Sequence, residues 1–421
     1  MNLEYLNLLK RKLDEQHMLA LTAPGNVIVA AGAGSGKTQV LATRFAYLVM
    51  SFGIKADRIL TLTFTKKAAS EMYQRIYKTL EFFANHPEVP DVEKKRAQEA
   101  IADFAKVHIQ TLDSYNASVL KQCASRYGIR PDFTQGDMEN GNLALEYVMK
   151  NRDSDVVHYL VNEKNFGNLQ EIACDIQNEI MLRSSLASDP DNFEKLCRLK
   201  KEGCIKMWNE NIPKLLSLIN EFNKTYDLSF GYSRTMEENK LKIDNLEEYI
   251  KILPDDFSSY NSSLYSEIAD NLGNFKLSTQ YLKGNDEDLK FIVQQFRGQD
   301  NPNASVPVML MSAAYLRDFD SFLSYSKFLD AFMKEVNKEK RSSGSLSFSD
   351  ISEMALKALM EQEDLRTQEQ NAYDRIMIDE FQDNNSKNRN LLFLLSGKPG
   401  LKPEEILRGR ENIMPDKLFF V

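Results

Sequence analysis

Residues 26–38 decide the fold and read Asn26-Val-Ile-Val-Ala-Ala-Gly-Ala-Gly-Ser-Gly-Lys37-Thr38. The β-branched run at 26–31 predicts a buried strand, and the residues after Thr38 favour a helix. Glycines in the connecting loop let backbone N–H groups surround a polyphosphate at the helix amino end, where the helix dipole favours anions. Lys37 is expected to reach the β- and γ-phosphates, and the Thr38 hydroxyl to hold Mg²⁺. The predicted phosphate site comprises Ala31, Gly32, Ala33, Gly34, Ser35, Gly36, Lys37 and Thr38.

A second segment complements this loop near the other end of the chain. It reads Ile376-Met-Ile-Asp379-Glu380-Phe-Gln382-Asp383, a short apolar strand that ends in acidic residues. Carboxylates at the end of a buried strand are costly to desolvate unless a cation lies beside them. Next to a phosphate-binding loop, Asp379 is expected to ligate Mg²⁺ and Glu380 to orient or deprotonate the attacking water.

The pattern of predicted secondary structure changes twice between these two segments. Residues 1–129 alternate short β-branched runs, such as 58–64, with helical stretches, which is typical of a parallel α/β sheet. Residues 130–345 show long helical periodicities with apolar stripes that favour a helix core, and few strand signals. After residue 346 the α/β texture returns, with Ser349 or Asp350 as the expected cap of a helix. We therefore predict three segments: 1–129, 130–345 and 346–421.

Composition excludes several classes of protein. The chain has 421 residues, of which 43% are hydrophobic and 27% charged, so it is not a disordered or fibrous protein. It contains no run of 18 apolar residues, which argues against a membrane span. The four cysteines and four histidines show neither CxxC nor HxxxH spacing, which argues against a zinc site or disulfide framework and fits a reducing cytoplasm.

The charge is unevenly distributed. The net charge is −8, but residues 1–129 carry 17 Lys and Arg against 12 Asp and Glu. A basic segment in an acidic chain is compatible with a DNA-binding groove, and equally with ordinary solvated lysines.

Three shorter segments add possible ligand contacts. Gln16, in Asp14-Glu15-Gln16, offers an amide for a nucleotide base. The stretch from Leu62 to Met72 turns from a strand into a helix and offers hydroxyls, an aromatic ring and lysines for phosphate contact and base stacking. Residues 109–115 form another hydroxyl-rich strand end. The candidate DNA contacts are Thr63, Phe64, Thr65, Lys66 and Thr111. Taken singly, each segment also fits a helix cap, a core residue or a turn.

In this order the segments resemble the first RecA-like domain of superfamily 1 DNA helicases, the UvrD/Rep/PcrA group. The loop at 31–38 is similar to that group's AGAGSGKT, residues 63–72 to its TFTxxAAxEM motif, and residues 379–383 to its DExQD motif. The resemblance covers about 1–129 and 346–421. It implies an α/β fold in which a parallel RecA-like sheet carries a large, mostly helical inserted subdomain. Residues 130–345 are long for the insertion of UvrD itself, and their length is more similar to that of the insertion in the AddA and RecB helicase–nuclease subunits.

The resemblance also implies an activity and its participants. The expected activity is ATP-dependent helicase or translocase movement along DNA, 3′→5′, within a helicase–nuclease of double-strand-break repair. Gln16 would read adenine, Gln382 would sense the γ-phosphate, and ATP and Mg²⁺ would be the cofactors. The expected partners are single- and double-stranded DNA and a second helicase–nuclease subunit.

Some positions depart from the pattern of the resembled group. Asp113 stands where that group has His, and Asn384 and Asn388 stand where it has Thr and Gln. The chain ends on Lys417-Leu-Phe-Phe-Val421, which predicts a central strand, so we expect a fragment that stops before the second RecA-like domain and has little activity alone.

Two other classes of function are compatible with a phosphate loop. One is a non-catalytic module that docks a partner subunit or DNA, although retention of Lys37, Asp379 and Glu380 argues against it. The other is a nucleotide-hydrolysing enzyme that acts on something other than DNA, such as a metabolite kinase. The Thr63-Phe-Thr65 and Asp379–Asp383 segments favour a helicase over both.

Overall fold

The computed structural model describes residues 5, 8, 15–30, 32, 36–136, 141–163, 166–253, 262–273, 275–280, 286–297, 306–383 and 385–421. The chain divides into two compact units, each described here by itself. The first unit comprises Met1–Glu139, Ser184–Ala187 and Asn337–Val421, and the second comprises Asn140–Arg183 and Ser188–Val336. No described helix has the length and apolar character needed to cross a membrane.

Five strands of the first unit form one parallel sheet in the order β1-β7-β6-β2-β3. Their bounds are β1 Val27–Ile28, β2 Ile59–Thr63, β3 His108–Thr111, β6 Arg375–Ile378 and β7 Leu418–Phe420. The register pairs Leu62 with Ile378 and Val27 with Phe419. The prediction that the two ends of the chain share one sheet is therefore confirmed. The predicted strand at 26–31 is much shorter than expected, because only Val27 and Ile28 belong to β1.

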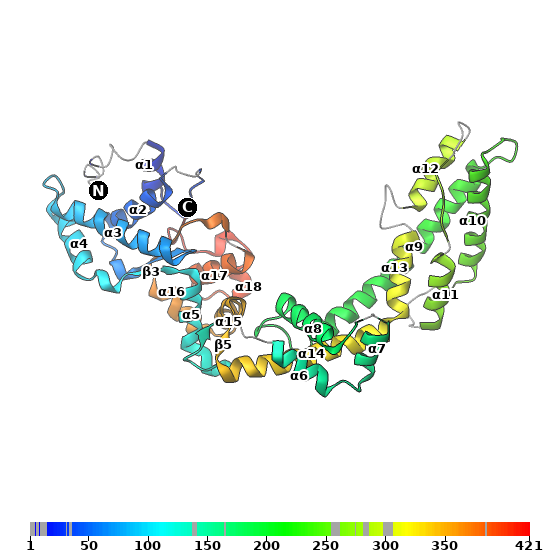
Figure 1. Ribbon diagram of the computed structural model, residues 1–421. Coiled ribbons are helices and arrows are strands. Elements are labelled where there is room, and N and C mark those ends of the chain that lie inside the picture. Colours follow the sequence, from blue (N-terminus) through cyan, green and yellow to red (C-terminus); the bar gives the residue numbers. More distant parts are fainter. Residues whose placement is uncertain are drawn as a thin grey trace. The chain divides into compact units, whose positions relative to one another are not determined.

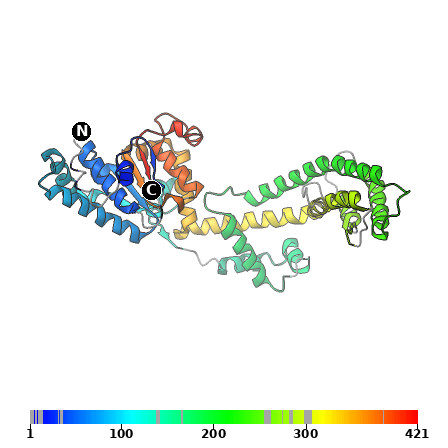
Figure 2. The ribbon, with the colours of Figure 1, turned by 90° about the horizontal axis from the view of Figure 1, so that it is seen from above.

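Helices cover both faces of this sheet (Figures 1 and 2). On one face Met377 and Phe419 pack with α2 (Lys37–Phe52), α3 (Lys66–Asn85) and α4 (Asp91–Ala102). On the other face Ile376, Ile378 and Phe420 pack with α5 (Leu112–Cys123), α15 (Phe348–Glu361) and α17 (Ser386–Ser396). This alternation is the two-residue period of a strand that is buried on both faces. The remaining helices of the unit are α1 Glu15–Thr22, α16 Glu363–Ala372 and α18 Pro403–Ile406.

The described residues of the second unit form helices joined by turns and loops, with no strand among them (Figure 1). Its helices are α6 Gly141–Lys150, α7 Asp155–Glu163, α8 Leu169–Arg183, α9 Asn192–Thr225, α10 Arg234–Lys251, α11 Ser262–Gly273, α12 Glu287–Phe296 and α13 Val306–Arg317. The predicted apolar stripes are core: Trp208 and Phe222 of α9 are fully buried, as is Phe332 of α14 (Phe319–Ser343). The predicted α/β fold with a helical insertion is confirmed.

The two units do not divide at the predicted residues 129/130 and 345/346. They divide after Glu139 and after Val336, and the second division falls inside α14. Backbone pairing explains part of the shift, because β4 (Thr134–Gln135) and β5 (Ser345–Leu346) form a small parallel sheet within the first unit. Ser184–Ala187 also joins that unit, where the Leu186 N–H donates to Asp350 at 2.8 Å.

The expected cap of α15 was wrong. Ser347 caps this helix, and neither Ser349 nor Asp350 does so. The Ser347 hydroxyl accepts from the Asp350 N–H, while the Asp350 carboxylate accepts from the Ser347 N–H at 3.1 Å. This reciprocal capping box satisfies two helix-end donors, one more than a lone cap would satisfy.

Candidate active site

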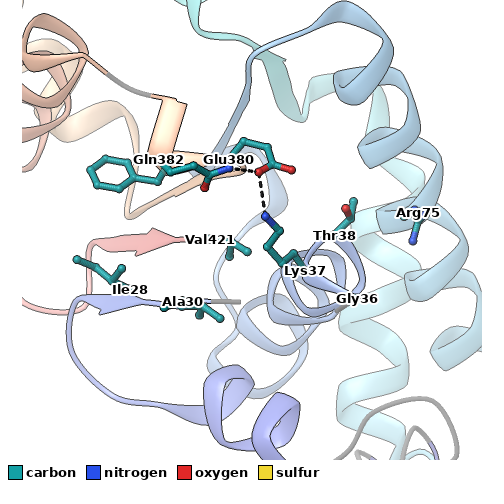
Figure 3. Close-up of a pocket in the computed structure, with 11 residues that line it drawn as sticks. Ile28, Ala30, Gly36, Lys37, Thr38, Arg75, Glu380, Gln382 and Val421 are labelled. Carbon is teal, nitrogen blue, oxygen red and sulfur yellow. Dashed lines mark hydrogen bonds and ion pairs between the residues drawn. The ribbon is translucent and has the colours of Figure 1, made fainter. Parts of the chain in front are cut away.

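A pocket of about 900 Å³ opens at the carboxyl edge of the sheet, where β1, β6 and β7 end (Figure 3). Its wall combines residues from both ends of the first unit. They are Ile28, Val29, Ala30, Gly36, Lys37, Thr38, Arg75, Glu380, Phe381, Gln382 and Val421. Ligands of open parallel sheets bind at this edge because the loops that follow the strands converge there.

Lys37 is the first residue of α2, and Gly36 precedes it in a left-handed conformation with φ 83°. Glycine adopts this conformation without steric cost, so the chain can turn sharply into the helix. The Lys37 ammonium donates to Glu380 Oε2 at 2.9 Å (Figure 3). The phosphate loop and the acidic segment, 343 residues apart in sequence, thus meet on one pocket wall.

Glu380 accepts from two donors. Lys37 provides the first, and the Gln382 side-chain amide provides the second. The Lys37 hydrogen bond and then the Gln382 hydrogen bond hold the pKa of Glu380 below its usual value. Glu380 is therefore a carboxylate at neutral pH.

The backbone of Glu380 is left-handed, with φ 55°. This conformation costs a residue other than glycine about 1–2 kcal/mol. The neighbouring residue holds it in place: Phe381 N–H donates to Val421 O at 2.8 Å, and the Phe381 ring stacks on Phe420 with centroids 4.0 Å apart. The strain turns the chain at the end of β6, where Glu380 joins the pocket wall.

Asp379 is a buried carboxyl group with few partners. Its side chain accepts from the Glu380 N–H at 3.1 Å, and its own N–H donates to Leu62 O. Burial, and then the charge of Glu380, raise the pKa of Asp379. None of the ion pairs between described residues includes Asp379. A cation at this position would favour the charged form and lower the pKa again.

The donor set at this edge suits Mg²⁺. The Thr38 hydroxyl and Asp379 carboxylate are hard oxygen ligands on the two segments that meet there. In the described part of the chain, no group of three His, Cys, Asp or Glu residues is placed to hold a metal ion. Mg²⁺ usually takes one or two protein ligands together with phosphate oxygens and water, so these two residues fit it.

The other predicted nucleotide contacts lie nearby or outside the described residues. Gln16 is exposed on α1, and the next residue, His17, lies against the start of α2: a Cβ added to Gly36 would be 3.4 Å from His17 Nε2. Gly32 is exposed. Four loop residues lie outside the described part, namely Ala31, Ala33, Gly34 and Ser35.

Hydroxyl groups of the candidate DNA segments are used within the fold. Thr63 is buried and donates to Thr65 O at 3.1 Å. Thr65 caps α3 by accepting from the Ala68 N–H, and the buried Thr111 caps α5 by accepting from the Ser114 N–H. These three residues therefore also fit the structural interpretation that the sequence left open.

Other side chains at the same strand ends are accessible. Phe64 is half-buried, and Lys66 is exposed in the first turn of α3. They follow β2, which pairs with β3, so residues 64–66 and the start of α5 lie at one edge of the sheet. This edge could accept an extended polyanion with bases.

Sequence reasoning missed Arg75. It lies on α3, is exposed and lines the pocket (Figure 3), and its charge lowers the pKa of Asp379 against the effect of burial. Arg75 lies three residues after Met72, the last residue of the 63–72 segment, and this spacing on one helix could have suggested that Arg75 lies near the site. The direction in which an exposed helical side chain points is, however, fixed by packing rather than by spacing.

The family model for the UvrD/REP helicase N-terminal domain matches residues 13–401. The chain belongs to this family. Both halves of the pocket wall described above fall within the matched residues, apart from Val421. The family match and the shared sheet agree that residues before and after the helical unit in the sequence form one α/β fold.

Curated relatives of this UvrD/REP family chain are helicase–nuclease subunits. An ATP-dependent helicase/nuclease subunit from Clostridium beijerinckii is 27% identical over 94% of the chain and 34% of its own length. A protein of the same name from Lactococcus lactis strain SK11 is 26% identical over 91% of the chain and 35% of its own length. An exonuclease/helicase subunit RexA from L. lactis strain MG1363 is 24% identical, also over 91% of the chain and 35% of its own length. The chain thus spans about a third of the length of these relatives.

Proposed function

We propose that this chain is the ATP-binding part of an ATP-dependent DNA helicase or translocase that works with a nuclease. The observation that carries the proposal is the Lys37–Glu380 contact on the wall of one pocket at the sheet edge. A phosphate-binding lysine beside an ionised glutamate is suited to phosphoryl transfer to water, because one can hold the phosphates and the other can orient the water. The family and the printed names of the relatives support the DNA-directed part of the proposal.

Each residue of the pocket has a role in this proposal. Lys37 and the backbone from Gly36 onward bind the phosphates, and Glu380 accepts a proton from the attacking water or orients it. Gln382, which donates a hydrogen bond to Glu380, would sense whether a γ-phosphate is present. Thr38 and Asp379 would hold Mg²⁺, which neutralises charge on the phosphates when bound.

Single-stranded DNA would lie along the edge that follows β2 and β3. Phe64 would stack on a base, while Thr65 and Lys66 would contact phosphates. Thr63 and Thr111 would act mainly by fixing the turns into α3 and α5, because both are buried and their hydroxyls are engaged there, whereas Thr65 is exposed. We infer 3′→5′ movement from the motif resemblance alone.

Turnover by the chain alone is expected to be slow. The Glu380 side chain is 44% exposed, so the described pocket leaves the reacting group open to solvent. Charge developing on a transferred phosphoryl group is commonly stabilised by an additional arginine, worth about 10³–10⁵ in rate. The resemblance implies that a second RecA-like domain provides such arginines, and the relatives have length to contain it.

Two titrations on the purified chain test the proposal against its alternatives. The first measures Mg·ATP binding by calorimetry, and the second measures anisotropy of a labelled oligothymidylate with and without Mg·ATP. We expect both ligands to bind, with each changing the affinity of the other. Nucleotide binding without DNA binding would favour an enzyme acting on another substrate. DNA binding without nucleotide binding would favour a docking module.

A further inference from the structure

Arg44 is a buried arginine with an unusual set of partners. It lies on α2, two turns after Lys37, and only 5% of it is exposed. Its guanidinium donates to Leu21 O through Nη1 and to Ala23 O through Nη2, the latter at 3.0 Å. Both acceptors are backbone carbonyls at the carboxyl end of α1, the helix that carries Gln16.

Aromatic rings lie beside the Arg44 guanidinium, and the carboxylate of Asp416 attracts its charge without forming an ion pair. The guanidinium carbon lies 5.2 Å from the Phe419 ring centroid and 5.6 Å from that of Tyr47. None of the ion pairs between described residues involves Arg44. Burying a charge without a counter-ion is costly, and an apolar side chain would fill the same space at lower cost. The carbonyl groups at the carboxyl end of a helix attract a cation. The charge of Arg44 therefore holds the end of α1 against α2.

Apolar packing also holds α1. Leu21 is fully buried in the core beside α2, but apolar packing has no preferred direction and leaves the helix free to adjust. A guanidinium that donates to two carbonyls fixes both distance and angle, which an ammonium group cannot do. At the opposite end of α1, His17 lies against Gly36 of the phosphate loop. The geometry of α1 therefore sets where Gln16 lies relative to that loop.

We propose that Arg44 is a positioning residue for base selectivity: by clamping the carboxyl end of α1 to α2, it fixes Gln16 relative to the phosphate loop. The inference rests on the proposed function, because it assumes that Gln16 contacts the nucleotide base. Arg44 itself would touch neither the base nor the phosphates of the nucleotide. Its consequence is that loss of the clamp should affect recognition of the base and leave recognition of the phosphates intact.

Calorimetric titration of the chain with Mg·ATP, Mg·GTP and Mg·tripolyphosphate tests this consequence. We expect the wild type to prefer ATP to GTP, and Arg44→Lys to reduce this preference about three- to tenfold, the range for a lost hydrogen bond. Tripolyphosphate affinity should change less than about twofold, since charge and helix α2 remain. Gln16→Ala should reproduce the loss, and adding Arg44→Lys to it should cause no further loss.

Val49→Ala is the matched control, because it removes buried packing from the same helix without touching α1 carbonyls. It should lower the melting temperature and leave the ATP preference unchanged. The role of Arg44 would be overturned if Arg44→Lys weakened tripolyphosphate binding in parallel or left the preference for ATP over GTP unchanged. It would also be overturned if the wild type showed no such preference. If tripolyphosphate does not bind, or if Lys37→Ala leaves its affinity unchanged, the proposed nucleotide site fails as well.

Discussion

Replacing Lys37 with alanine separates nucleotide binding from stability. The Lys37 side chain is 15% exposed and its partner Glu380 is 44% exposed, so their ion pair is partly solvated. Such pairs contribute about 0–1 kcal/mol to folding, whereas a hydrogen bond from an ammonium to phosphate contributes about 1.5–3 kcal/mol. The expected result is therefore a loss of about 10- to 150-fold in Mg·ATP affinity with less than about 1 kcal/mol lost in stability.

Calorimetry with Mg·ATP measures the affinity, and urea unfolding measures the stability. Lys106→Ala is the matched control: Lys106 pairs with Asp103 at 2.7 Å and precedes β3, at the opposite edge of the sheet from the pocket. Its removal should change neither quantity appreciably. The reasoning would be refuted if Lys37→Ala bound Mg·ATP like the wild type, or if Lys106→Ala weakened binding equally.

Further predictions concern DNA contact and the buried Asp350. Phe64→Ala should weaken oligothymidylate binding by about 1–3 kcal/mol, measured by anisotropy, with the melting temperature nearly unchanged; a large stability loss with normal DNA binding would show a core role. Asp350 is fully buried and pairs with Lys340 at 2.8 Å. Asp350→Asn should therefore lower the free energy of unfolding, measured in urea, by about 3–5 kcal/mol. A decrease below about 1 kcal/mol would contradict the pairing argument. Burial raises the pKa of Asp350, but Lys340 and other donors more than offset this, so its pKa is lower folded than unfolded. The stabilisation should therefore be present above the unfolded pKa of about 4 and be lost as pH falls below it, a loss that Asp350→Asn should not show.

The nucleotide-binding half of the fold was readable from local sequence. A β-branched run and a helix-forming segment on either side of a glycine-rich loop predicted β1 and α2 almost without tertiary information, although β1 is shorter than predicted. The strand that precedes Asp379 was similarly direct. A shared sheet then followed from the need to place both segments at one edge, whereas the direct pairing of β6 with β2 is known only from the structure. These features depend on short-range patterns, so distant packing did not obscure them.

The rest depended on contacts between residues far apart in sequence. The left-handed backbone of Glu380 is held by Val421, and the Arg44 clamp depends on where α1 packs. The unit boundary within α14 could not be read from periodicity, because one continuous helix has the same pattern on both sides. The sequence left open whether the Thr63 and Thr111 hydroxyls contact DNA or fix turns, and only the structure shows that both are engaged in turns.

The most direct test of the central claim is the Mg²⁺ dependence of ATP binding in the wild type and in Asp379→Asn. The claim is that residues 36–38 and 379–382 form one site for a metal-bound nucleotide. Calorimetric titrations with ATP, in Mg²⁺ and in excess chelator, measure this dependence. We predict that Mg²⁺ strengthens ATP binding at least about tenfold in the wild type and much less in Asp379→Asn, because one of the two protein ligands is weakened. An equal Mg²⁺ effect in both proteins, or no ATP binding by the wild type, would contradict the account.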